Sequence, residues 1–79
     1  MVERLVRLSS IEQVKSFVNI AMAKDYDVDL TQGKYIVNGK SIMGVFSLDL
    51  TLPIKMVAHC PVDDGILAET QVFDCEKPQ

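Results

Sequence analysis

The feature that most constrains the fold of this chain is a run of apolar residues at helical spacing, placed directly behind two serines. Ser9 and Ser10 are each followed three positions later by an acidic or amide residue, so either Ser9 with Glu12 or Ser10 with Gln13 forms a capping box. Behind this start, apolar residues recur every three or four positions: Ile11, Val14, Phe17, Val18, Ala21 and Met22. The pattern predicts an amphipathic helix from about Ser10 to Lys24, whose apolar face must pack against another layer.

Strand patterns surround this helix. Residues 2–8 mix apolar and charged side chains, and residues 26–30 alternate apolar residues with aspartates, as a strand with one solvated face does. After a turn at residues 32–34, residues 34–37 form the partner strand of a hairpin. Residues 54–60 alternate again and predict a fourth strand.

Two shorter helical segments complete the chain. Residues 41–48 or 41–49 are predicted to form a short helix after the Asn38-Gly39 turn. Gly44 inside this helix lowers its stability by up to about 1 kcal/mol relative to alanine. We therefore expect this glycine to permit a close approach of another backbone or a partner. Residues 63–70 begin like a helix, with acids at the N-terminal end, and about residues 74–79 are expected to fray. The order β-α-β-β-α-β-α predicts one α+β domain, an open-faced β-sandwich in which a four-stranded antiparallel sheet carries helices on one face and the last helix is short.

Composition limits the classes of partner. The chain has 79 residues and a net charge of −3, which fits one small domain and offers no electrostatic reason to bind nucleic acid or a membrane surface. No apolar stretch approaches the roughly 20 residues that a spanning helix needs, and the N-terminal residues lack the apolar region of a signal peptide. We therefore expect a cytoplasmic protein without nucleic-acid or membrane partners.

Metal and cofactor chemistry have little support in the sequence. Asp25, Asp27 and Asp29 recur at every second position, which suggests either a cation site or a plain solvated strand face, and no chelating loop accompanies them. Cys60 and Cys75 fit neither a zinc site nor a redox motif, so we expect free thiols, with a disulfide as the alternative if the tail folds back. We expect no bound metal and no cofactor.

Ser41 stands at the predicted start of the second helix and has two interpretations. A serine there is a preferred N-cap, while a phosphate on it would meet unsatisfied backbone N–H groups. The segment behind it contains more large apolar residues than a short helix buries on one side: Ile42, Met43, Val45, Phe46 and Leu48. Either all five belong to the core, or some stay exposed as an adaptable recognition surface.

Residues 40–48, with the sequence KSIMGVFSL, resemble the serine-centred regulatory segment of HPr, the small phosphocarrier of the bacterial sugar phosphotransferase system, in its Gram-positive form. The resemblance extends more weakly from about Ile11 to Cys60. It implies the HPr architecture and phosphorylation of Ser41 by a dedicated ATP-dependent kinase. It also implies that the phosphoprotein docks on a transcription regulator of carbon catabolite repression through Ile42, Met43 and Phe46.

The catalytic residues of that family are missing from this chain. HPr-like carriers hold their phosphoryl group on a histidine at the start of the first helix, in a His-x-Arg-Pro motif. The resemblance carries the histidine position to Ser10, the arginine position to near Glu12 and the proline position to near Gln13, and Glu12 would repel a phosphoryl group. The only histidine, His59, lies on the predicted fourth strand without a helix N-terminus or a neighbouring arginine, so we expect no catalytic residue.

The leading hypothesis is therefore a non-catalytic HPr-like regulatory or protein-binding module, switched at Ser41. It is similar to catabolite repression HPr, which also lacks the catalytic histidine. One alternative is a phosphocarrier with a displaced acceptor, which requires an exposed His59 next to backbone N–H donors; another is a scaffold that keeps only the fold. The expected partners are proteins, by resemblance HPr kinase and a catabolite-control transcription regulator, and exposed apolar residues leave a homodimer open.

Overall fold

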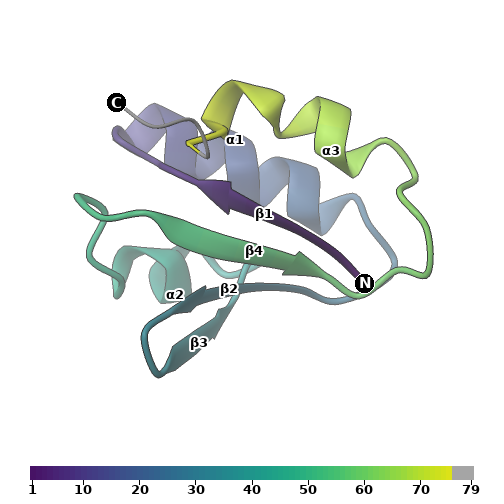
Figure 1. The fold of residues 1–79 in the computed structure, drawn as a ribbon. Coiled ribbons are helices and arrows are strands. Elements are labelled where there is room, and N and C mark those ends of the chain that lie inside the picture. The colour runs from purple at the N-terminus through teal and green to yellow at the C-terminus, as the bar shows by residue number, and fades with distance from the viewer. Residues whose placement is uncertain (76–79) are drawn as a thin grey trace.

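The computed structural model describes residues 1–75 and contains a four-stranded sheet in the order β1-β4-β2-β3, in which every neighbouring pair is antiparallel. The elements in chain order are β1 (Val2–Val6), α1 (Ile11–Met22), β2 (Val28–Gln32), β3 (Tyr35–Asn38), α2 (Ile42–Phe46), β4 (Ile54–Ala58), α3 (Ile66–Glu69) and the 3₁₀ turn η1 (Gln71–Phe73). The crossovers through α1 and α2 each skip one strand, so two split β-α-β units interleave. Figure 1 shows the helices on the same side of the sheet, which confirms the predicted α+β class with an open antiparallel sheet.

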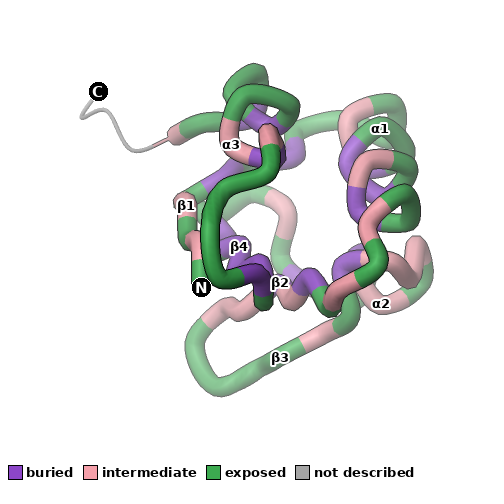
Figure 2. The backbone as a smooth tube through the Cα atoms, turned by 90° about the vertical axis from the view of Figure 1, so that its right-hand side faces the viewer, coloured by how far each residue is buried: buried purple, intermediate pink, exposed green. Residues whose placement is uncertain are grey.

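The two faces of the sheet differ in burial. Six residues of one face lie in the core under the helices: Val6, Val28, Leu30, Ile54, Met56 and Ala58. The other face carries Glu3, Lys55 and Thr31, together with the exposed Leu5 and Ile36. Figure 2 shows the sheet as one layer and α1 with α2 as the second, with buried positions on the strands and on the inner side of α1. In the described residues, no helix covers the second face.

The first helix begins where its capping serines predict. The Gln13 N–H donates to Ser10 Oγ at 3.1 Å, and Gln13 Oε1 accepts from the Ser9 N–H at 2.8 Å, so the amide side chain bonds to the residue before the N-cap. The buried face of α1 holds Val14, Phe17, Val18 and Ala21. The sequence prediction is wrong for Ile11 and Met22, which are exposed because they lie in the terminal turns of the helix.

The hairpin is shorter than predicted at its entry. β2 begins at Val28 and not at Tyr26, and a two-residue turn at Gly33 and Lys34 leads into β3. Gly33 has φ = 60°, a conformation that glycine adopts without steric cost, as the first central position of a type II′ turn requires. Asp29 lies on the uncovered face of the sheet, opposite Val57.

The C-terminal segment packs back onto the first strand. The Cys75 N–H donates to the Leu5 carbonyl oxygen at 3.1 Å, and Asp74 forms a bridge with Val6, so the fraying expected from about residue 74 does not begin there. The rest of that expected tail, residues 76–79, lies outside the described residues. Phe73 is buried and its ring meets that of Phe17 edge to face, with centroids 6.0 Å apart. Aromatic contact therefore ties the chain end to α1.

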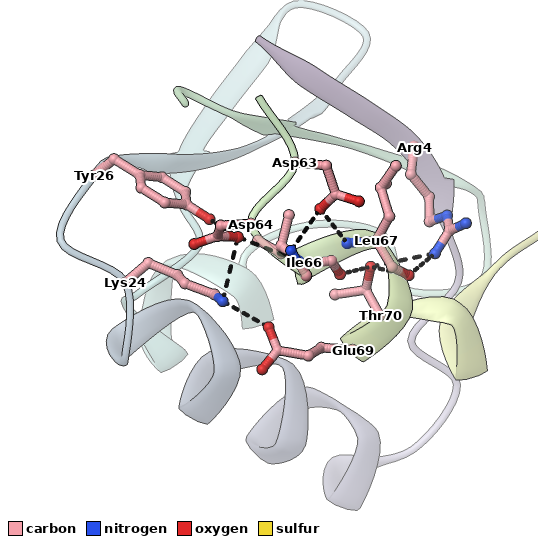
Figure 3. A network of polar contacts seen from close by, with 10 residues as sticks. Arg4, Lys24, Tyr26, Asp63, Asp64, Ile66, Leu67, Glu69 and Thr70 are labelled. Atoms are coloured by element: carbon pink, nitrogen blue, oxygen red, sulfur yellow. Dashed lines mark hydrogen bonds and ion pairs between the residues drawn. The ribbon is translucent and has the colours of Figure 1, made fainter. Parts of the chain in front are cut away.

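A polar network holds α3 against the rest of the domain, as Figure 3 shows. Lys24 Nζ lies 2.6 Å from Glu69 Oε1 and 3.5 Å from Asp64 Oδ1, and the Tyr26 hydroxyl donates to Asp64 Oδ1 at 2.9 Å. On another side of the helix, the Arg4 guanidinium donates to the Leu67 carbonyl oxygen. The predicted acids at the helix start act as caps: Asp63 accepts the Gly65 and Leu67 N–H groups, and Asp64 accepts the Ile66 N–H.

This network predicts that stability declines at both extremes of pH. The hydrogen bond from Tyr26 lowers the pKa of Asp64 below its ordinary value of 3.8, so the stability that Asp64 contributes is present above about pH 4 and is lost as the pH falls through the lowered pKa. Burial raises the pKa of Tyr26, and the hydrogen bond to Glu69 raises the pKa of Lys24, so their contributions are lost only as the pH rises above about 10. Urea denaturation followed across the pH range measures both declines.

The substitution Tyr26→Phe tests the source of the acid decline. Without the phenol, the pKa of Asp64 moves back toward its ordinary value, and the acid-side loss of stability becomes smaller. Tyr35→Phe is the matched control, because Tyr35 is exposed on the edge strand and its hydroxyl makes no side-chain hydrogen bond within residues 1–75. An unchanged acid profile in Tyr26→Phe would contradict the assignment.

Candidate functional site

Ser41 is the N-cap of α2 and is half-exposed. Its Oγ accepts the Gly44 N–H at 3.1 Å, its carbonyl oxygen accepts the Val45 N–H at 3.0 Å, and its own N–H donates to the Asn38 carbonyl oxygen at 3.0 Å. The capping interpretation is therefore confirmed. Ser41 as a whole residue is only partly buried, so capping the helix does not place it in the core.

The Asn38-Gly39 turn holds Ser41 at the end of β3. The Gly39 N–H donates to the Val28 carbonyl oxygen at 2.6 Å, and Asn38 Oδ1 accepts the Lys40 N–H at 2.9 Å. A side chain at position 39 would meet that carbonyl oxygen at 2.8 Å, so the turn requires glycine by close approach and not by a positive φ. The turn signal in the sequence therefore marks the residue that positions the serine.

The apolar residues behind Ser41 divide between core and surface. Val45 and Leu48 are buried and Ile42 is half-buried against the core, whereas Met43 is 76% exposed and Phe46 is 40% exposed. The interpretation that all five are core is wrong, because the α-helical part has only five residues and presents a single inner face. Met43 and Phe46, with the edge of Ile42, form what we call the α2 patch.

Gly44 does not face the close backbone neighbour that was one of its two expected reasons, and its approach to a partner stays a prediction. A Cβ added there would lie 3.4 Å from Ser41 Oγ and 3.5 Å from Val37 Cβ, which are ordinary van der Waals contacts. No neighbouring backbone within residues 1–75 comes close enough to require a glycine. The structure therefore gives no packing reason for Gly44.

A surface hollow of about 470 Å³ lies next to the α2 patch and was not found from the sequence. Its lining comes mainly from the β1–α1 and α2–β4 connections. Figure 1 shows both connections at the same end of the sheet. The lining residues of the hollow are Arg7, Ser9, Ser10, Ile11, Phe46, Leu50 and Thr51. Phe46 belongs to both the hollow and the α2 patch, so the two features form one continuous surface.

The position that the resemblance assigns to a catalytic histidine lies in this hollow. Ser10 occupies it as the N-cap of α1, with its hydroxyl bonded to the Gln13 N–H, and the exposed Glu12 follows in the first turn. Arg7, at the end of β1, brings the only positive charge to the lining, and its side chain forms no ion pair within the described residues. The hollow thus offers one cation, three hydroxyl groups and apolar walls, and it holds no nucleophile activated by a base.

No protein-family model and no curated protein matches this chain. The structural findings that bear on function are therefore the α2 patch, Ser41 and the hollow. Within residues 1–75, none of the helices has the length and apolar character of a membrane span.

His59 and this surface lie at opposite ends of β4. His59 follows the end of β4, whereas the hollow lies beyond the start of that strand. Its Nε2 is 2.8 Å from Asp29 Oδ2, and within residues 1–75 the ring makes no hydrogen bond to a backbone N–H. His59 is exposed, as a displaced phosphoacceptor would need, but its neighbour is a carboxylate that repels a phosphoryl group.

The remaining candidate ligands do not converge. In the described part of the chain, no three histidine, cysteine, aspartate or glutamate side chains are grouped to hold a metal ion. Asp29 pairs with His59, which accounts for one of the three alternating aspartates. Cys60 is buried after the end of β4, and no disulfide joins it to Cys75.

Proposed function

We propose that this chain is a non-catalytic HPr-like protein of the phosphotransferase and catabolite-regulation type, which acts in the cytoplasm as a regulatory, protein-binding module. The observation that carries the proposal is the half-exposed residue Ser41 beside the exposed Met43 and Phe46. A modifiable group next to an apolar patch is the arrangement that a phosphorylation-controlled docking surface needs. The resemblance of residues 40–48 to the HPr regulatory segment supplies the expected modification.

The architecture is compatible with this assignment. The sheet is antiparallel, open on one face and covered on the other by α1, α2 and α3, as expected for an HPr-like open-faced sandwich. At the position of the missing phosphoacceptor, Ser10 caps a helix and Glu12 brings a negative charge. These residues favour a role that requires no phosphoryl transfer.

A phosphate on Ser41 would act through local charge. The unmodified Oγ accepts the Gly44 N–H, so phosphate oxygens attached there would lie beside the first backbone N–H groups of α2. The modification adds close to two negative charges next to Met43, and a partner with an arginine cluster beside an apolar pocket would recognise the pair together. We infer that phosphorylation creates a composite site rather than exposing a hidden one.

The hollow extends this docking surface. A partner side chain that is apolar along its stem and acidic at its tip fits walls formed by Ile11, Phe46 and Leu50, together with Arg7, which forms no ion pair within residues 1–75. The partner is therefore expected to present two groups. A cationic group, such as an arginine cluster, would bind phosphoserine, and an acidic or apolar side chain would enter the hollow. The catabolite-control transcription regulator implied by the resemblance is the proposed class.

The scaffold is the second candidate and keeps the same fold without the switch. It would be favoured by a serine that no kinase modifies. A phosphocarrier that uses His59 is weaker, because the ring is paired with Asp29.

The deciding experiment is intact-mass spectrometry with site mapping, after the chain is incubated with ATP and an HPr serine kinase from the same source organism. We expect a single added phosphate on Ser41, abolished in Ser41→Ala. Ser47→Ala is the matched control, since Ser47 is the exposed serine at the opposite end of α2 and its removal should leave the modification intact.

Absence of modification in folded protein would overturn the Ser41 switch and favour the scaffold. Loss of modification in both serine variants would show that the kinase responds to the stability of α2 and not to Ser41 as its target. Circular dichroism of each variant separates these outcomes from unfolding.

A further inference from the structure

The edge strand β3 lacks the usual protection against pairing with another chain. Its four residues, Tyr35–Asn38, contain no charge and no proline, and Tyr35 is 61% and Ile36 is 69% exposed. The opposite edge, β1, is partly covered because Cys75 and Asp74 pair with it, and it carries the charged Glu3 and Arg4. Among the described residues, no segment pairs with the outer side of β3. Of short length, charge, proline and a covering segment, β3 therefore has only its short length within the described residues.

The hydrogen-bond phase of β3 shows which of its backbone groups face outward. The Gly39 N–H donates to the Val28 carbonyl oxygen, so position 39 points toward β2. Because this direction alternates along an antiparallel strand, Val37 and Tyr35 also point toward β2, while Ile36 and Asn38 point away. The Asn38 carbonyl oxygen already accepts the Ser41 N–H. The free edge therefore presents the N–H and carbonyl oxygen of Ile36 and the N–H of Asn38.

We propose that β3 pairs antiparallel with β3 of a second copy of this chain, so that the two sheets become one. The two-fold axis lies midway between Ile36 of one copy and Ile36 of the other. A two-fold axis perpendicular to the sheet keeps every side chain on its own face, and directly opposed residues of an antiparallel pair share a face. Both conditions hold only when one residue lies opposite its own copy across the axis. Centred on Ile36, the two copies exchange N–H···O bonds between their outward-facing Ile36 groups. The Asn38 N–H then reaches the carbonyl oxygen of the partner's Lys34.

The side chains of this register are self-complementary. On the uncovered face, Ile36 meets the partner's Ile36, and on the helix face Tyr35 meets the partner's Val37, an aromatic and β-branched pair of the kind that stabilises sheets. Lys34 lies opposite the partner's Asn38, and the partner's Asp29 on β2 lies next to that Asn38. No like charges therefore oppose each other across the interface. Centring on Val37 instead would place Tyr35 against the partner's Gly39 and would require the Asn38 carbonyl oxygen that Ser41 occupies.

The first test is the mass of the full-length chain by sedimentation equilibrium. One short strand pair buries little area, so we expect a weak dimer whose population rises over roughly 10–1,000 µM chain. Ile36→Lys places two ammonium groups opposite each other and is expected to weaken the dimer at least about tenfold. A protein that stays monomeric up to about 1 mM overturns the proposal.

Two matched controls test whether β3 or another surface forms the dimer interface. Val72→Lys, at an exposed apolar residue of η1, and Met43→Lys, in the α2 patch, should leave the dimer intact. Dissociation by Met43→Lys and not by Ile36→Lys would assign the contact to the α2 patch and overturn the β3 pairing. Because Ile36 is exposed, the thermal unfolding of Ile36→Lys at low concentration should match that of the wild type, which separates lost pairing from lost folding.

The register is tested by oxidation of single-cysteine additions, with the linkage mapped by peptide mass spectrometry. Ile36→Cys brings two thiols to opposing positions with Cα atoms ~5.5 Å apart, within the range for a disulfide. Val37→Cys is the control, because its Cα atoms would be about 8 Å apart in this register. Efficient linkage at 36 and not at 37 supports the axis between the two Ile36 residues, and the reverse overturns it.

The dimer is independent of the function proposed above. Its tests use unmodified protein and read mass and cross-linking, so they succeed or fail whether or not a kinase modifies Ser41.

Discussion

Replacing Phe17 with alanine is expected to remove about 3–5 kcal/mol from the free energy of unfolding. The ring is buried in the centre of the α1 face and contacts Phe73 edge to face, so the substitution leaves a cavity and also releases the C-terminal segment from α1. A domain of 79 residues has a total stability of about 4–12 kcal/mol. Urea denaturation followed by circular dichroism should therefore show a large fall in midpoint, or a chain already partly unfolded in buffer.

Phe46→Ala is the matched control, since it makes the same chemical change on the surface. Phe46 is 40% exposed at the rim of the hollow, and its removal should cost less than about 1 kcal/mol. If Phe46→Ala were as destabilising as Phe17→Ala, Phe46 would belong to the core and the α2 patch would lose its aromatic member.

Gly39→Ala is expected to destabilise the protein by about 1–3 kcal/mol, the usual range for overpacking. The added Cβ would lie 2.8 Å from the Val28 carbonyl oxygen and 3.3 Å from Phe17 Cε1, and the first of these atoms is backbone in the middle of the fold. Relief requires the turn to move away from β2, which lengthens the hydrogen bond from the Gly39 N–H to the same carbonyl oxygen. Chemical denaturation measures the loss, and hydrogen exchange of the Ser41 N–H, which bonds to Asn38, reports whether the turn has moved.

Gly44→Ala is the control for this effect. A Cβ at position 44 meets only Ser41 and Val37 at ordinary contact distances, and alanine is the better helix former by up to about 1 kcal/mol. The two glycine substitutions should therefore differ in sign, and a Gly39→Ala protein as stable as the wild type would contradict the close approach seen at Val28.

The class of fold was predictable because its signals are local. The capping serines and the spacing from Val14 to Ala21 specify α1, and alternation specifies the core face of β4. Element ends were less well determined. Ile11 and Met22 continue the helical spacing yet are exposed, since periodicity describes a face and not how far the neighbouring layer extends beneath it.

The candidate site was predictable only in part. Ser41 and the exposure of part of its apolar segment follow from one continuous stretch of sequence, whereas the hollow joins Arg7 and Ser10 to Phe46 and Thr51 from the other half of the chain. Nothing near Arg7 in the sequence distinguishes it from the other surface cations. Arg7 stands three residues before Ser10, the N-cap of α1, but a cation at that spacing does not by itself predict a hollow.

Sequence by itself determined that this chain forms one α+β domain, that Ser10 caps the first helix and that Ser41 caps the second. These are properties of neighbouring residues, set by caps, turns and periodicity. Tertiary structure alone decided which apolar residues of α2 face outward, that Arg7 stands in a hollow beside Phe46, and that β3 is the unprotected edge. Those properties depend on which distant segments lie side by side, and no local pattern encodes the packing that brings them together.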